Sequence, residues 1–158
     1  MKERLATLPL AETDPITSDE WLIRLVWHER VTDRDPVIAP SSFEPRANEP
    51  GGISLYRLAC LTDPADALKP FPDVAKRDRY AIVLVSVALI ERLGFRVQPD
   101  LRPDVPGHVL ISEININTFK ADRKRFRPIL IALANEASGD QIFHEKKPLA
   151  TKRRKEHS

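Results

Sequence analysis

The chain of 158 residues suits a single domain, and 42% hydrophobic with 30% charged residues is ordinary for a folded, soluble protein. Its net charge of +2 conceals an uneven distribution. Residues 1–118 hold 14 Lys and Arg against 18 Asp and Glu, a net charge of −4, whereas residues 119–158 hold 11 against 5, a net charge of +6. The most apolar run, residues 81–90, would be about 15 Å long as a helix, half of a hydrocarbon layer. We therefore exclude a membrane-spanning protein and expect no membrane partner.

The composition predicts three regions. Residues 1–20 are polar and contain prolines, which indicates an N-terminal arm. Residues 21–142 carry the apolar segments of one domain, and residues 143–158 form a basic tail that is too polar to order itself. The single cysteine, Cys60, cannot form an internal disulfide, and no apolar signal-peptide core follows Met1. We therefore expect a cytoplasmic protein.

Alternation of apolar and polar residues predicts the strands. It is clearest in residues 21–27, which are rich in aromatic and β-branched side chains, and it recurs in residues 53–59, 95–98 and 108–114. A loop containing proline and glycine joins the last two segments, which favours a hairpin. Seven prolines between residues 36 and 72 indicate many loops in the first half. We expect an α+β fold with a small mixed or antiparallel sheet of about four strands.

Residues 74–93 predict a central helix buried against that sheet. Asp73 can cap its start, and Gly94 occupies the usual position at its end. β-branched residues in the middle of the segment favour a strand, but a length of 20 residues with charges at both ends favours the helix.

A basic helical region follows the last predicted strand. Asn117 or Thr118 can cap its start, and apolar residues recur at helical spacing in Phe119, Phe126, Leu130 and Leu133. Pro128 costs ~3 kcal/mol inside a helix because it lacks the amide hydrogen that would bond to Lys124. We therefore expect a kink or two short helices, the second ending near Gly139.

Basic residues gather in this C-terminal quarter in two sets. The helical set is Lys120, Arg123, Lys124 and Arg127. The tail set is Lys146, Lys147, Lys152, Arg153, Arg154 and Lys155. The spacing of the first set places its members on one side of a helix, where they could follow a phosphate backbone or bind an acidic protein. The alternative is a solvated helix face and a solubility tail.

Titratable residues on or beside the predicted strands form a second candidate site. They are Arg24, His28, Arg57, His108 and Glu113. On neighbouring strands, either histidine could act as a general base, Glu113 as an acid or orienting group, and either arginine as the site for an anionic substrate. The alternative is structural, because alternation places polar residues on one face of any half-buried strand.

Motifs for cofactors and metals are absent from the sequence. It contains no G-x-x-x-x-G-K-[ST], no G-x-G-x-x-G and no G-x-S-x-G. Its four histidines show no metal-ligand spacing, and one cysteine cannot build a Cys-rich zinc site. We therefore expect no cofactor and no metal.

Several short segments resemble a layout that recurs in small uncharacterised bacterial proteins. These segments are residues 27–28, 42–43, 52–57, 93–97 and 104–111. The resemblance covers residues 21–115 and implies a small α+β bacterial domain, often encoded as one gene within a larger cluster. The spacing of Arg, His, Ser and Glu also resembles the mono-ADP-ribosyltransferase layout, although the Gly-rich and paired-glutamate elements of those enzymes are absent.

Two hypotheses of different classes follow. The first is a non-catalytic component of a bacterial multi-protein system that binds nucleic acid or an acidic protein partner through its basic C-terminal region. The second is a small enzyme or toxin that acts on an anionic substrate through a cleft of His, Arg and Glu. The absence of a catalytic or cofactor signature favours the first.

Overall fold

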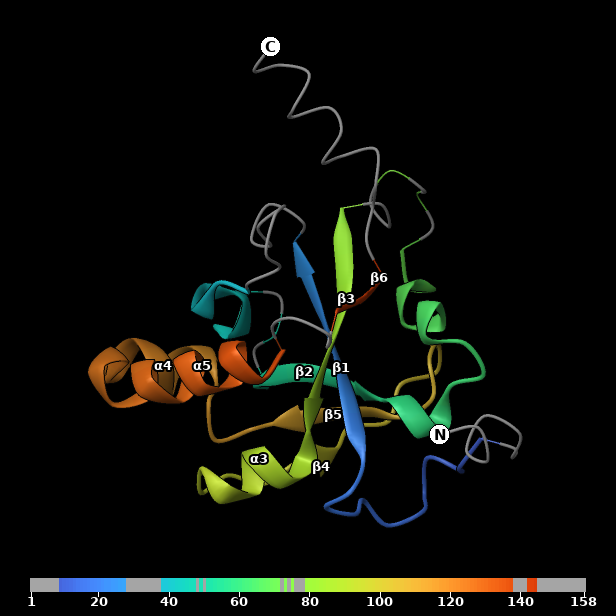
Figure 1. Ribbon diagram of the computed structural model, residues 1–158, viewed down its shortest axis with the longest axis horizontal. Helices are drawn as coiled ribbons and strands as arrows, with labels where there is room; N and C mark the ends of the chain where they lie inside the picture. Colours follow the sequence, from blue (N-terminus) through green and yellow to red (C-terminus); the bar gives the residue numbers. More distant parts are fainter. Residues whose placement is uncertain are drawn as a thin grey trace.

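A six-stranded antiparallel sheet organises the protein, with its strands in the order β4-β5-β2-β1-β3-β6 (Figure 1). The computed structural model describes residues 9–27, 38–47, 49, 51–71, 73, 75 and 79–137, and the backbone of 142–144. The strands are β1 (Trp21–Trp27), β2 (Ile53–Arg57), β3 (Tyr80–Ser86), β4 (Gln98–Pro99), β5 (His108–Ile111) and β6 (Ile142–His144). The predicted α+β class is confirmed, with more strands than the sequence indicated.

Helices and helical turns occupy the connections between these strands. The 3-10 helices are η2 (Pro40–Phe43), η3 (Leu58–Cys60) and η4 (Pro64–Leu68). The α-helices are α3 (Val87–Arg92), α4 (Ile116–Ala121) and α5 (Arg123–Ala137). No helix within the described part of the chain is long and apolar enough to cross a membrane.

Strand β1, which the sequence predicts at residues 21–27, lies between β2 and β3 in the sheet. It pairs along its whole length with β3, from Trp21 opposite Ser86 to Trp27 opposite Tyr80, and its start also pairs with β2. Both of its faces are buried, because the sheet is covered on each side. The predicted antiparallel pairing of the next two strands is confirmed, since β4 pairs with β5, but their bounds differ: β4 is Gln98–Pro99 rather than residues 95–98, and β5 ends at Ile111 rather than at Ile114.

The predicted helix over residues 74–93 is wrong. Residues 80–86 form strand β3, which lies between β1 and β6, and among residues 79–93 only 87–92 are helical. A strand in this position is buried on both faces, so it shows a continuous apolar run instead of alternation. The β-branched side chains of Ile82, Val83 and Val85 suit that environment. Helix α3 begins at Ser86, whose hydroxyl accepts a hydrogen bond from the amide of Leu89. Asp73, the predicted cap, accepts a hydrogen bond from the amide of Ala75 at 2.9 Å and does not start α3.

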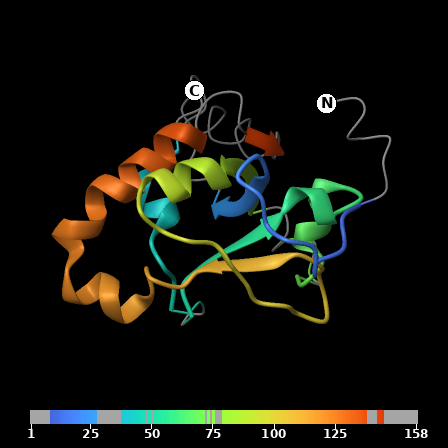
Figure 2. The ribbon, with the colours of Figure 1, turned by 90° about the horizontal axis from the view of Figure 1, so that it is seen from below.

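Each face of the sheet packs against a different set of elements. On one face, Leu22 and Val26 of β1 belong to a core that includes Phe43 of η2 and Leu130 of α5. Figure 2 shows α3 and α5 on this side. On the other face, Ile23 and Leu25 pack in a second core with apolar residues of η4. The helix α5 and the turn η2 are thereby brought together over the first face.

The C-terminal region contains the helices α4 and α5, but Pro128 does not divide them. They are separated at Asp122, and α5 continues through Pro128, contrary to the expectation that this proline ends a helix. The cap of α4 is also earlier than expected: the Asn115 side chain accepts hydrogen bonds from the amides of Asn117 and Thr118. Phe119 and Phe126 face the core, as predicted.

Candidate functional site

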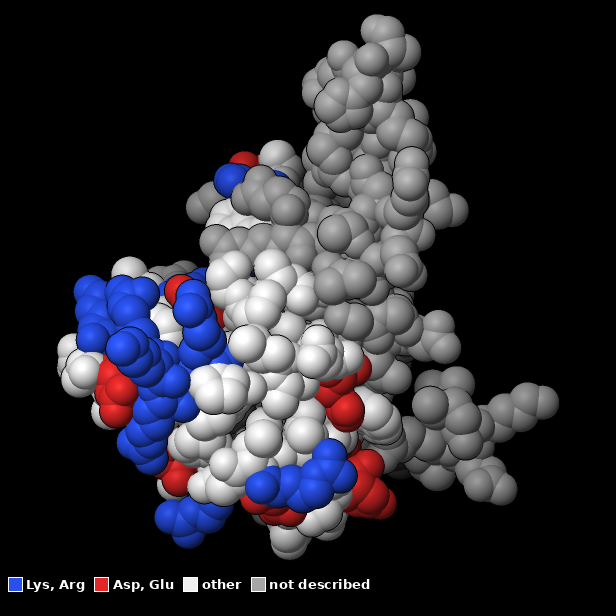
Figure 3. All heavy atoms as spheres, turned by 60° about the vertical axis from the view of Figure 1, so that its left-hand side comes forward, with Lys and Arg blue, Asp and Glu red and all other residues white. Residues whose placement is uncertain are grey.

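A surface groove of about 480 Å³ lies between η2 and the C-terminal helices. Its first wall comes from the η2 region and consists of Pro40, Ser41 and Glu44. Its second wall comes from α4 and α5 and consists of Phe119, Arg123, Lys124, Arg127, Leu130 and Ile131. Three cations of the predicted helical set therefore line one groove, which we call the α5 groove. Figure 3 shows basic side chains gathered over this end of the molecule.

The cations of the α5 groove occupy an electrostatically unfavourable place in their own helix. Four of the first five residues of α5 are Arg or Lys, and all four are exposed. The N-terminus of a helix carries a partial positive charge, so each cation there is unfavourable by about 0.3–1 kcal/mol. One carboxylate opposes them at this end, since Asp122 accepts a hydrogen bond from the amide of Arg125. An anion bound at this surface would relieve the repulsion.

Helix geometry also divides the predicted set. Arg123, Lys124 and Arg127 share the groove wall, whereas Lys120 lies on α4 and is not among the lining residues. The break at Asp122 separates it from the others, whereas the prediction placed residues 120–127 on one helix. The tail set, residues 146–155, lies outside the described residues.

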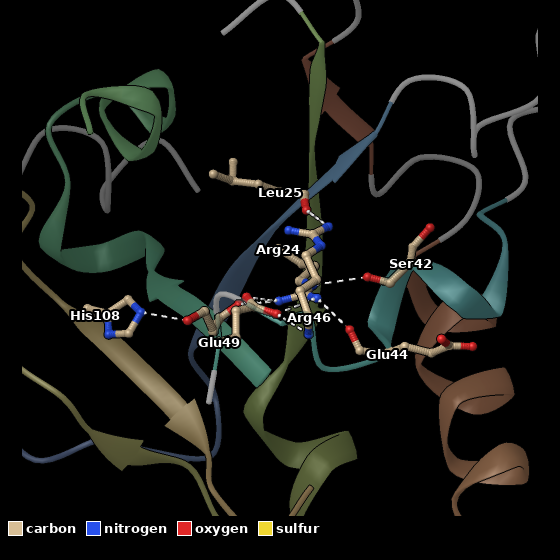
Figure 4. A network of polar contacts seen from close by, with 8 residues as sticks. Arg24, Leu25, Ser42, Glu44, Arg46, Glu49 and His108 are labelled. Atoms are coloured by element: carbon tan, nitrogen blue, oxygen red, sulfur yellow. Dashed lines mark hydrogen bonds and ion pairs between the residues drawn. The ribbon is translucent and has the colours of Figure 1, made fainter. Parts of the chain in front are cut away.

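The wall formed by η2 is fixed to the sheet by the buried Arg24. Its Nε donates to the carbonyl of Ser42 at 3.1 Å and its Nη2 to the carbonyl of Glu44 at 3.1 Å (Figure 4). The Nη1 donates to the carbonyl of Ser54 on β2 at 2.9 Å. The guanidinium of Arg24 therefore connects β1 to β2 and to the η2 segment, and it fixes the position of the η2 wall relative to the sheet.

A buried ion pair balances the charge of Arg24. The carboxylate of Glu49 accepts hydrogen bonds from Nη1 at 2.7 Å and from Nη2 at 3.2 Å, and the side chain of Glu49 is only 8% exposed. Burial is the largest single effect and would raise the pKa of the Glu49 carboxyl, but the charges and hydrogen bonds of Arg24 and Arg46 together outweigh it, so the pKa lies below its ordinary value. Arg46 adds to the network, because its amide donates to Glu49 and its Nη2 to the carbonyl of Leu25.

His108 joins this network through the hydroxyl of Ser54. The Nε2 of His108 lies 2.9 Å from Ser54 Oγ, and Nδ1 lies 3.0 Å from the carbonyl of Asp100. A carbonyl only accepts, so Nδ1 carries the proton and Nε2 accepts from Ser54. Burial lowers the pKa of His108, despite the nearby carboxylate of Asp100, and favours the neutral ring.

Arg57, the second arginine of the predicted cleft, binds the segment that precedes β1. Its guanidinium forms a bidentate pair with Glu20, at 2.8 and 2.7 Å, and its Nη1 donates to the carbonyl of Asp14 at 2.8 Å. The hydrogen bond to Glu20 is the main reason that the pKa of Arg57 is raised. These contacts hold residues 12–20 against the sheet.

The structure brings together only some of the residues of the predicted His, Arg and Glu cleft. Arg24 and His108 meet in one network, but both are only 1% exposed and their polar atoms contact groups of the fold. Glu113 is exposed on the turn after β5 and accepts a hydrogen bond from the amide of Arg96. His28 lies outside the described residues. The arrangement within the described residues is that of a structural network rather than an open catalytic cleft.

The sequence did not indicate the η2 wall. Pro40, Ser41 and Glu44 belong to the proline-rich connection and reach α5 only in the folded chain. Within the part of the chain that the structure describes, no group of three or more His, Cys, Asp or Glu is placed to hold a metal ion. The fold and site thus define an α+β protein with a cationic groove beside its C-terminal helices. No family model matches the chain, and neither does any curated protein or solved structure.

Proposed function

We propose that this protein is a non-catalytic component of a larger assembly and that it binds an anionic partner, nucleic acid or an acidic protein, through its basic C-terminal region. The observation that carries the proposal is the row of exposed cations at the start of α5, three of which line the α5 groove. Their position opposes the helix dipole and brings like charges together. A binding role explains why these cations lie at the start of α5, where they lower the stability of the helix.

The contact surface comprises Lys120, Arg123, Lys124 and Arg127, with the tail cations as a second contribution. Binding of this kind is electrostatic, so affinity falls as salt rises. It needs no catalytic group, which agrees with the burial of Arg24, Arg57 and His108 in contacts within the fold.

The test measures binding of the full chain to labelled duplex DNA, single-stranded RNA and polyglutamate across a salt series. The variant R123E/K124E removes the groove cations, and K69E/R102E makes the same change of charge at two exposed sites outside the groove. We expect binding to at least one probe that weakens with salt and is weakened further by R123E/K124E but not by K69E/R102E. For a nucleic acid the salt slope falls by about two units.

Two results would overturn the proposal. One is no salt-dependent binding to any of the three probes. The other is equal weakening in both charge-reversal variants, because that would make net charge, rather than the α5 groove, responsible. Comparing the affinities of the full chain and of residues 1–143 then measures how much the tail contributes to binding.

A further inference from the structure

The α5 groove is not lined by charge alone. Leu130 and Phe119 are nearly buried beneath its helical wall, and Pro40 contributes an apolar surface from the opposite wall. Ile131 is 41% exposed there, a high value for a large hydrophobic side chain in a folded domain. Covering it would remove apolar surface from water, which a purely electrostatic ligand does not do.

The aromatic rings of this region are not open to stacking. The guanidinium of Arg123 lies over the ring of Phe119, 5.1 Å from its centre, and Phe119 is 5% exposed. Arg125 lies over Phe126 at 4.9 Å, and Phe126 is 1% exposed. Single-stranded nucleic acid gains much of its affinity from bases stacked on exposed rings. The groove offers aliphatic contact instead.

The charges of the groove are also one-sided. Arg123, Lys124 and Arg127 line the α5 wall, whereas the η2 wall carries Glu44. A phosphate backbone is anionic throughout and would meet that carboxylate as well as the cations. A peptide can present carboxylates to α5 and neutral or apolar groups to η2.

We infer that the partner is a protein segment in which acidic residues flank an aliphatic side chain, and that this side chain enters the α5 groove beside Ile131. The carboxylates of the segment pair with Arg123, Lys124 and Arg127. The inference rests on the proposed function and selects the acidic protein among its anionic partners. Charge supplies attraction and orientation, while the aliphatic side chain supplies specificity.

The test uses two labelled acidic dodecapeptides that differ only at two positions. Both positions are Leu in the Leu peptide and Ser in the Ser peptide, and duplex DNA is the third probe. Their affinities for the full chain are compared at one salt concentration. The variant Ile131→Ser alters the aliphatic contact, and Leu101→Ser is its control because Leu101 is 52% exposed and outside the groove. R123E/K124E is measured in parallel.

We expect the Leu peptide to bind about tenfold more tightly than the Ser peptide, since a leucine side chain passes from water into apolar contact. Ile131→Ser should remove most of that difference, and Leu101→Ser should preserve it. Equal affinity for the two peptides, with both lost in R123E/K124E, overturns the inference and leaves the proposed function standing. If DNA binds more tightly than the Leu peptide and Ile131→Ser does not weaken that binding, the inference is also overturned and the proposed function still stands. If R123E/K124E changes the affinity for none of the probes, both the inference and the proposed function are overturned.

Discussion

Arg24 and Glu49 form a buried ion pair, with 2.7 Å between Nη1 and Oε2, although 25 residues separate them in the chain. Arg24 lies on the central strand, whereas Glu49 follows the η2 turn in the proline-rich connection. Because the same guanidinium also binds the carbonyls of Ser42 and Glu44, this pair connects the sheet to a wall of the α5 groove. The stability of the core and the shape of the groove therefore depend on one interaction.

Removing the carboxylate of Glu49 should be costly. Glu49→Gln leaves the Arg24 guanidinium buried without a counter-charge, and we expect it to lower the free energy of unfolding by about 3–5 kcal/mol. Urea unfolding at pH 7 measures this change. The control Asp104→Asn removes an exposed carboxylate and should change stability by no more than about 0.5 kcal/mol. Similar costs for both variants would show that the ion pair does not hold the fold.

Mild acid should destabilise the protein through His108. Its pKa is lowered in the folded state from an ordinary value of 6.5, so the unfolded chain takes up the proton first as the pH falls. The contribution of the neutral ring is complete above pH 6.5 and decreases below it, by at most about 1.4 kcal/mol per pH unit. Unfolding free energies of wild type and His108→Asn between pH 7.5 and 5 test this. The asparagine variant should lack the extra slope below pH 6.5, and parallel curves would contradict the assignment.

Charge reversal at the start of α5 should separate stability from binding. Lys124→Glu places an anion at the positive end of the helix and removes repulsion from Arg127, three residues later on α5. We expect the free energy of unfolding to rise by about 0.5–1 kcal/mol while the affinity for an anionic probe falls. Lys69→Glu is the control for net charge. A loss of both stability and binding in Lys124→Glu would instead indicate a structural role for the lysine.

Two glycines with positive φ should respond differently to alanine. A Cβ at Gly52, where φ is +138°, would lie 2.4 Å from the carbonyl oxygen of Ile111 on the neighbouring strand. At Gly94, where φ is +94°, a Cβ would meet nothing within 4 Å. Gly94→Ala should therefore cost only backbone strain, about 1–2 kcal/mol, and Gly52→Ala should cost about 2–5 kcal/mol because overpacking adds to the strain. Thermal unfolding of the two variants ranks these costs, and the reverse order would contradict the close approach of β2 to β5.

The sequence pattern predicted some of the secondary-structure elements and missed others. Strand β1 was located by its aromatic and β-branched residues, although both of its faces are buried. Strand β3 is also buried on both faces and was missed because its apolar run lies within a segment of 20 residues with charges at both ends, a pattern that also suits a helix. A break was expected at Pro128, but α5 continues through that residue and the two helices are separated at Asp122.

The candidate site was only half visible in the sequence for a related reason. The cations of α5 follow one another at helical spacing, so a periodic pattern revealed them. Glu44, Pro40 and Ser41 meet α5 through tertiary contact, and no local rule relates the two segments. The same applies to Arg24 and Glu49, whose opposite charges pair only after the proline-rich connection folds back onto the sheet.

The most direct test of the account is to map where an anionic segment binds on the full-length protein. Amide chemical shifts would be followed by NMR as the Leu-containing acidic dodecapeptide is added to the isotopically labelled chain. The account predicts saturable shifts in residues 40–44 and 119–131, the two walls of the α5 groove. Shifts confined to the tail, or to the opposite face around η4, would contradict it.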